Sequence, residues 1–90
     1  SSICFIGGSG HNPNLNGVTW FLDNVWSLIL KENPNFTFKI IGKWDEKIKT
    51  EYQKKYRNLF FCGFVDNLAM VISECIMVIP ILLPIMGIKK

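Results

Sequence analysis

Four short apolar runs alternate with three segments of helical periodicity along this chain. The runs lie at residues 3–6, 36–41, 59–62 and 76–79. They are close to continuously apolar, which is typical of parallel strands that are covered on both faces. Strands joined by helices form βαβ units with right-handed crossovers. The pattern therefore predicts an α/β fold, an open parallel sheet with helices on both faces.

Helix signals separate the four runs. Pro13 starts the first predicted helix and Asn33-Pro34 ends it, and its apolar residues recur at helical spacing: Leu15, Val18, Leu22, Val25, Trp26 and Ile29. The second helix is predicted to be more exposed, with Asp45 as its N-cap and Ile48, Tyr52 and Tyr56 as its apolar stripe. The third is short, with Asp66 as its predicted cap and Leu68, Val71 and Ile72 as its apolar residues.

Composition and charge narrow the class of protein. Of the 90 residues 49% are hydrophobic and 19% are charged, which excludes an intrinsically disordered chain. The net charge of +3 arises from one segment, where six cations face three acidic residues: Lys43, Lys47, Lys49, Lys54, Lys55 and Arg57 against Asp45, Glu46 and Glu51. We interpret this segment as a solvated helix face, and we expect no nucleic-acid partner.

The cysteines and the apolar residues 76–88 indicate in which compartment of the cell the protein resides. Cys4, Cys62 and Cys75 are odd in number, widely spaced and free of any CxxC motif, so we interpret them as reduced core residues of a cytoplasmic protein without a metal site. Residues 76–88 are apolar, but they are fewer than the roughly 20 residues that a membrane span needs, and two prolines interrupt them. We expect a buried strand that leaves into a loop at Pro80, and no membrane span.

The glycine-rich turn at residues 7–10 is the strongest chemical signal. It lies between a strand and a helix, where backbone N–H groups can hold a phosphate. Pro13 replaces the third glycine of the dinucleotide fingerprint, and Gly42-Lys43 replaces the acidic residue that would bind a ribose, so a nicotinamide cofactor is disfavoured. No Gly-Lys-Ser/Thr follows, which excludes a P-loop, and we expect no cofactor.

Catalytic signals are sparse. The chain has one histidine and neither a GxSxG nor an HExxH motif, and we assign no catalytic residue. His11 lies in the loop after the first strand, where a ligand would bind, although a lone loop histidine is more often a hydrogen-bonding or solvated residue.

Several short motifs follow one another along the chain: Ile6-Gly7-Gly8, Pro13-Asn14 with Gly17-Val18 and Trp20-Phe21, Ile40-Ile41-Gly42, Gly63-Phe64-Val65-Asp66, Pro80, and Gly87-Ile88-Lys89. Their order and spacing resemble the carboxy-terminal domain of GT-B glycosyltransferases of group 1 (family 4). The resemblance implies a Rossmann-like domain that binds a nucleotide-diphosphate sugar in a cleft facing an acceptor domain. It also implies sugar transfer with retention of configuration.

Matching the motifs gives each candidate residue a role. By resemblance, the donor diphosphate and sugar are held by Gly7, Gly8, Gly87, Ile88 and Lys89, and the nucleobase loop consists of Phe64, Val65 and Asp66. Lys89 would neutralise charge on the leaving diphosphate. His11 stands where relatives often have tyrosine, as a further possible donor contact.

The resemblance also sets the expected domain boundaries. Residues 1–90 are expected to be a fragment of one nucleotide-sugar-binding domain, without the acceptor-binding amino-terminal domain or the acidic segment that grips the donor. Such a fragment should not catalyse transfer alone, and its uncovered apolar surface should favour self-association.

The alternative is a non-catalytic interaction module of the flavodoxin or receiver type. A receiver would need clustered acidic residues where Gly7, Gly8 and Gly42 stand.

Overall fold

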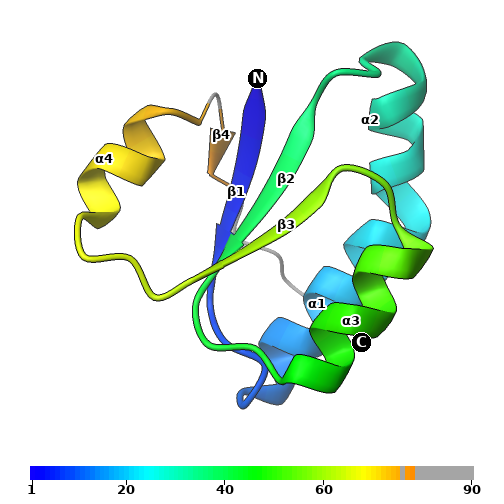
Figure 1. Cartoon of the computed structure of the whole chain (residues 1–90). Helices are drawn as coiled ribbons and strands as arrows, with labels where there is room; N and C mark the ends of the chain where they lie inside the picture. Colours follow the sequence, from blue (N-terminus) through cyan, green and yellow to red (C-terminus); the bar gives the residue numbers. More distant parts are fainter. Residues whose placement is uncertain (76, 79–90) are drawn as a thin grey trace, which may run out of the picture.

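A computed structural model describes residues 1–75 and 77–78 (Figure 1). Four strands form one parallel sheet in the order β3-β2-β1-β4, where β1 is Ser2–Ile6, β2 is Thr37–Ile41, β3 is Leu59–Gly63 and β4 is Met77–Val78. In the register, Ile3 lies between Phe38 and Met77. The predicted open parallel sheet is confirmed. Residues 76, 79 and 80 of the predicted fourth strand and its end lie outside the described residues.

The predicted first helix is a continuous helical segment with a wider turn in its middle. It consists of α1 (Asn12–Phe21), the π-helical η1 (Leu22–Trp26) and α2 (Ser27–Glu32). The second helix is α3 (Glu46–Lys55) and the third is α4 (Leu68–Ser73). The chain adds β2 and then β3 on one side of β1, and it then returns across the sheet to place β4 on the other side of β1. Right-handed crossovers therefore place α4 on the face opposite α1 and α3, as Figure 1 shows.

The core lies on the face of the sheet that α1, η1 and α3 cover. Its strand residues are Ile3, Phe5, Phe38, Ile40 and Leu59. Trp26 is buried among them with its ring centroid 5.5 Å from that of Phe38, and its Nε1–H donates to the carbonyl oxygen of Arg57 at 2.8 Å. The single polar atom of this large side chain is thus paired, as burial of an indole requires.

The opposite face of the sheet is only partly covered. Cys4 and Ile41 are buried there, whereas Ile6 and Phe60 are exposed. The helix on this side, α4, buries none of its own side chains fully. Lys39 of β2 and Glu74, after α4, form an ion pair across this face at 3.8 Å.

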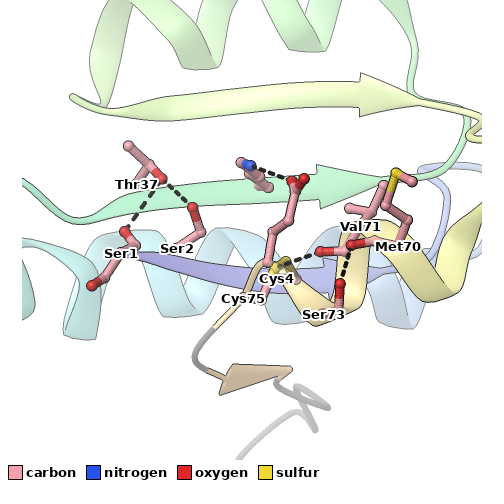
Figure 2. Close-up of a disulfide and its surroundings, with 10 residues drawn as sticks. Ser1, Ser2, Cys4, Thr37, Met70, Val71, Ser73 and Cys75 are labelled. Carbon is pink, nitrogen blue, oxygen red and sulfur yellow. Dashed lines mark hydrogen bonds and ion pairs between the residues drawn. A yellow bond between two sulfur atoms is a disulfide. The ribbon is translucent and has the colours of Figure 1, made fainter.

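Cys4 and Cys75 form a disulfide (Figure 2), and Cys62 is exposed. The interpretation of all three cysteines as reduced core residues is therefore wrong. The reason is the strand order: β4 pairs with β1, so the connection from α4 brings Cys75 to Cys4 with a Cα–Cα distance of 6.2 Å. The two residues are 71 positions apart in the sequence, where no spacing motif would link them.

The predicted helix caps have different outcomes. Asp45 caps α3 as predicted, and its carboxylate accepts from the backbone N–H groups of Lys47 and Ile48. The prediction that Asp66 caps α4 is wrong. Asn67 is the cap, accepting from the N–H of Met70 at 3.0 Å, because the helix begins one residue later and Asp66 stays in the exposed loop.

None of the helices described is both long and apolar enough to cross a membrane. Of the apolar stretch 76–88 for which we predicted no span, only Met77 and Val78 belong to the described residues.

Candidate functional site

Three loops meet at the carboxyl edge of the sheet, and backbone hydrogen bonds join them. They are the β1–α1 loop (7–11), the β2–α3 loop (42–45) and the β3–α4 loop (64–67). The N–H of Gly7 donates to the carbonyl of Ile41 at 2.8 Å, and the N–H of Gly42 donates to that of Gly63 at 2.9 Å. The β2–α3 loop therefore lies between the other two.

Gly7, Gly8 and Gly42 let these loops pack backbone against backbone. A Cβ on Gly8 would lie 2.8 Å from the carbonyl oxygen of Lys43, and one on Gly42 would lie 2.7 Å from that of Gly7. Gly42 also has φ +137°, which side-chain-bearing residues rarely adopt. Backbone atoms of the neighbouring loop occupy the space that a Cβ would need at Gly8 and Gly42, so the shape of this edge depends on these glycines whether or not a ligand is bound.

Trp44 stabilises the packing of the β1–α1 loop against the β2–α3 loop. Its side chain is buried, its Nε1–H donates to the carbonyl oxygen of Gly7 at 2.6 Å, and its ring packs on Phe61 with centroids 5.4 Å apart. Sequence analysis did not identify Trp44. The available signal was a tryptophan just past a strand end, since a buried indole N–H needs an acceptor nearby.

A second group of hydrogen bonds fixes the β1–α1 loop. Ser9 donates its backbone N–H to the carbonyl of Lys43 at 3.0 Å, and its hydroxyl oxygen accepts from the N–H of Asp45 at 2.9 Å. The amide of Asn14 donates to the carbonyl of Gly8 at 3.1 Å. Ser9 thus positions the β1–α1 loop against the β2–α3 loop.

A hollow of about 350 Å³ opens beside β2 and β3 at this edge. We call it the edge hollow, and its lining residues are Gly42, Lys43, Trp44, Asp45, Glu46, Lys49, Gly63 and Phe64. Three of the charged residues that line it have partners: the Lys49 ammonium lies 2.8 Å from the Glu46 carboxylate, and the Asp45 carboxylate caps α3. Lys43 is exposed and, within the described part of the chain, no carboxylate oxygen lies within 4.0 Å of its ammonium group. Lys43 is thus a cation available to an anionic ligand, a second residue that sequence analysis missed.

The predicted site residues occupy both sides of this edge. Gly7 and Gly8 are on one side of the β2 end, and the nucleobase loop of Phe64, Val65 and Asp66 is on the other. Phe64 is 88% exposed beside the edge hollow, Val65 is half-buried and Asp66 is exposed.

The remaining predicted residues differ in what the structure says of them. His11 is the exposed N-cap residue of α1, and its side chain makes no capping hydrogen bond. Gly87, Ile88 and Lys89 lie outside the described residues. Across the described residues, no three His, Cys, Asp or Glu side chains cluster as metal ligands would.

Comparison with known proteins gives the family. The family model of the group 1 glycosyl transferases matches residues 1–89. A curated relative, an uncharacterized 44.6 kDa protein in the cps region of Klebsiella pneumoniae, is 32% identical over 53 residues. The match covers 59% of this chain and 14% of that protein. No solved structure matches the chain. The family match covers nearly every residue, so this chain belongs to the group 1 glycosyl transferases.

Proposed function

We propose that this chain forms part of the donor-binding domain of a GT-B glycosyltransferase of family 4, and that a nucleotide-diphosphate sugar binds at the carboxyl edge of its sheet. One observation carries the proposal. The strand order reverses between β1 and β4, and the Gly7-Gly8 loop follows β1 at this point. Ligands of open α/β sheets bind outside the carboxyl ends of the strands at such a reversal.

The diphosphate is proposed to bind beside the Gly7-Gly8 loop. The amino terminus of α1 follows the Gly7-Gly8 loop, and its partial positive charge attracts phosphate. We propose that Gly7 and Gly8 hold the diphosphate and sugar together with Gly87, Ile88 and Lys89, with His11 as a further contact. The unpaired Lys43 joins this set, because it lies on the loop that packs against Gly8.

The nucleobase is proposed to bind in the loop of Phe64, Val65 and Asp66. The exposed ring of Phe64 lines the edge hollow, and an aromatic face of this kind can stack on a base. Proximity of Lys43 to the same hollow lets one bound nucleotide contact both residues.

Nuclear magnetic resonance titration with UDP, GDP and ADP tests this function. We expect one nucleotide to cause saturable shifts in residues 7–11 and 63–66. Lys43→Gln should weaken binding about tenfold, as loss of one charge-assisted hydrogen bond would. Lys47→Gln removes the same charge from an exposed position on α3 outside the edge hollow and should leave the affinity unchanged. Shifts confined to the amino ends of the strands, or equal effects of the two variants, would contradict the proposal.

The wider activity is proposed from the family alone. We propose a cytoplasmic enzyme that transfers sugar with retention, in which a separate domain binds the acceptor and an acidic segment elsewhere in the protein contacts the donor. This chain by itself is then expected to bind donor weakly and to be inactive. We further propose that the partly covered sheet face around Phe60 causes the isolated chain to self-associate.

A further inference from the structure

A second hollow lies at the other end of the sheet, where β2 and β3 begin. It has a volume of about 410 Å³, and its lining residues come from η1, α2, the end of α3 and the turn that joins α3 to β3. We call it the helix hollow, and its lining residues are Leu22, Trp26, Ser27, Leu30, Lys31, Lys55, Tyr56 and Arg57. Lys31 and Arg57 precede β2 and β3, whereas the proposed donor site follows the strands. The helix hollow is therefore distinct from the donor site.

Three cations from separate segments converge on the helix hollow. Lys31 is in the last turn of α2, Lys55 ends α3, and Arg57 is in the following turn. Among the residues that the structure describes, carboxylates pair with Lys39 and Lys49 but with none of these three. Like charges around one hollow repel one another, and a bound anion would relieve that repulsion.

Neighbouring contacts hold the cationic rim in place. The Trp26 indole N–H fixes the backbone of Arg57 through its carbonyl oxygen. The Lys55 ammonium lies 5.3 Å from the centroid of the Tyr56 ring, and the Tyr56 hydroxyl donates to the exposed carboxylate of Asp23. Asp23 itself does not line the helix hollow.

The inner wall of the helix hollow is apolar. Leu22 and Trp26 belong to the π-helical segment, a rare conformation that is frequent at functional sites, and Leu30 extends the wall along α2. An apolar wall below a cationic rim matches a ligand that has an anionic head and an organic body.

We propose that the helix hollow binds an organic phosphate. A guanidinium such as that of Arg57 can hold two phosphate oxygens at once, the two ammonium groups neutralise the remaining charge, and the organic group lies against Leu22 and Leu30. Such a phosphate occurs in soluble monoesters and in the headgroups of anionic phospholipids. The inference does not depend on the proposed donor site.

Two probes, phenyl phosphate and phosphatidylglycerol vesicles, distinguish the sources. Titration of the 90-residue chain with phenyl phosphate should shift the Trp26 indole N–H resonance saturably. Sedimentation with phosphatidylglycerol vesicles, against phosphatidylcholine vesicles as the neutral control, tests the lipid source. Saturable binding in either arm supports the proposal and names the source, and binding in neither arm overturns it.

A matched pair of double variants tests the location. Lys31→Gln with Lys55→Gln should weaken binding of the effective probe at least about tenfold, because two charge-assisted contacts are lost. Lys47→Gln with Lys54→Gln makes the same change in net charge at exposed positions on α3 outside the helix hollow and should alter binding by less than about twofold. Equal weakening by both double variants, or phenyl phosphate shifts confined to residues 7–11, would overturn the proposal. A dispersed amide spectrum for each variant verifies that it is folded.

Discussion

The indole N–H of Trp44 donates to the carbonyl oxygen of Gly7 at 2.6 Å, across 37 residues of sequence. This bond joins the loop after β2 to the loop after β1, and the two loops also share the backbone contact between Gly42 and Gly7. The shape of the carboxyl edge therefore depends on one buried side chain as well as on glycines. Any ligand bound there would meet a surface that is already held in place.

Replacing Trp44 with phenylalanine should destabilise the protein. The variant keeps an aromatic ring for packing against Phe61 but leaves the Gly7 carbonyl without its donor, which should lower the free energy of unfolding by about 1–2 kcal/mol. Urea unfolding measures this change. Trp20→Phe is the matched control, because Trp20 is 40% exposed, and it should change the free energy by less than about 0.5 kcal/mol. Equal losses in the two variants would show that the hydrogen bond contributes nothing.

Replacing Gly8 with alanine tests the packing of the loops. The new Cβ would lie 2.8 Å from the Lys43 carbonyl oxygen, a backbone atom that can move only with its loop, so we expect a loss of about 1–3 kcal/mol. Gly10→Ala is the control in the same loop, since a Cβ there meets nothing within 4 Å. Urea unfolding should separate the two variants. If Gly8→Ala were as stable as Gly10→Ala, the loops would be looser than the contact distance implies.

Local signals in the sequence predicted most of the fold, because residues close in sequence determine where helices are capped and where strands form. Asp45 caps α3 through N–H groups two and three residues away, and the apolar runs predict β1, β2 and β3 without knowledge of their neighbours. The cap of α4 was misplaced by one residue, because Asp66 and Asn67 are both good caps and the length of the preceding loop decides between them.

Features that depend on distant contacts escaped the sequence analysis. The Cys4–Cys75 bond and the Trp44–Gly7 bond each need the strand order before they can be predicted. The resemblance predicts Gly7 and Gly8 as donor-binding residues, but their contact with the β2–α3 loop could not be predicted, because the sequence does not indicate which backbone segment passes nearby. The sequence thus predicted which loops lie at the carboxyl edge of the sheet, but not how these loops pack against one another.

The disulfide should make stability depend on redox conditions. It closes a loop of 71 residues in sequence separation, for which the chain-entropy relation gives roughly 4 kcal/mol of stabilisation. Dithiothreitol should therefore lower the urea midpoint of the unmodified protein and of Cys62→Ser, whose thiol is exposed, but not of Cys75→Ser. An unchanged midpoint for the unmodified protein in dithiothreitol would contradict the prediction. Because disulfides are rare in the cytosol, trapping thiols in a cell lysate also tests the proposed cytoplasmic location.

Titration of Tyr56 should lower the free energy of unfolding at alkaline pH. Burial raises the pKa of its phenol, and the hydrogen bond to Asp23 and the negative charge of Asp23 raise the pKa further. The folded state then holds the phenolic proton more tightly than the unfolded chain, whose pKa is about 10. The stabilisation is therefore complete below about pH 10 and is lost as the pH rises above it.

Tyr56→Phe isolates this effect from the titration of lysines. The variant lacks the phenol, so its free energy of unfolding should fall less than that of the unmodified protein between about pH 8 and about pH 11. Urea unfolding at the two pH values gives the comparison. Parallel losses in both proteins would assign the alkaline sensitivity to other groups.

Phe60 should drive self-association of the isolated chain. Phe60 is 48% exposed on the sheet face that α4 covers incompletely. Other exposed apolar residues on β1, α4 and the loop before α4 are Ile6, Phe64, Leu68 and Met70. Phe60→Ser should therefore shift sedimentation toward the monomer at high protein concentration, because it removes apolar area that association would bury. Leu28→Ser is the matched control: Leu28 is 62% exposed, but it lies on α2, which is on the other side of the sheet. Association that weakens equally in both variants would reflect nonspecific apolar contacts, whereas loss with Phe60→Ser alone would identify this sheet face as the surface through which the isolated chain self-associates.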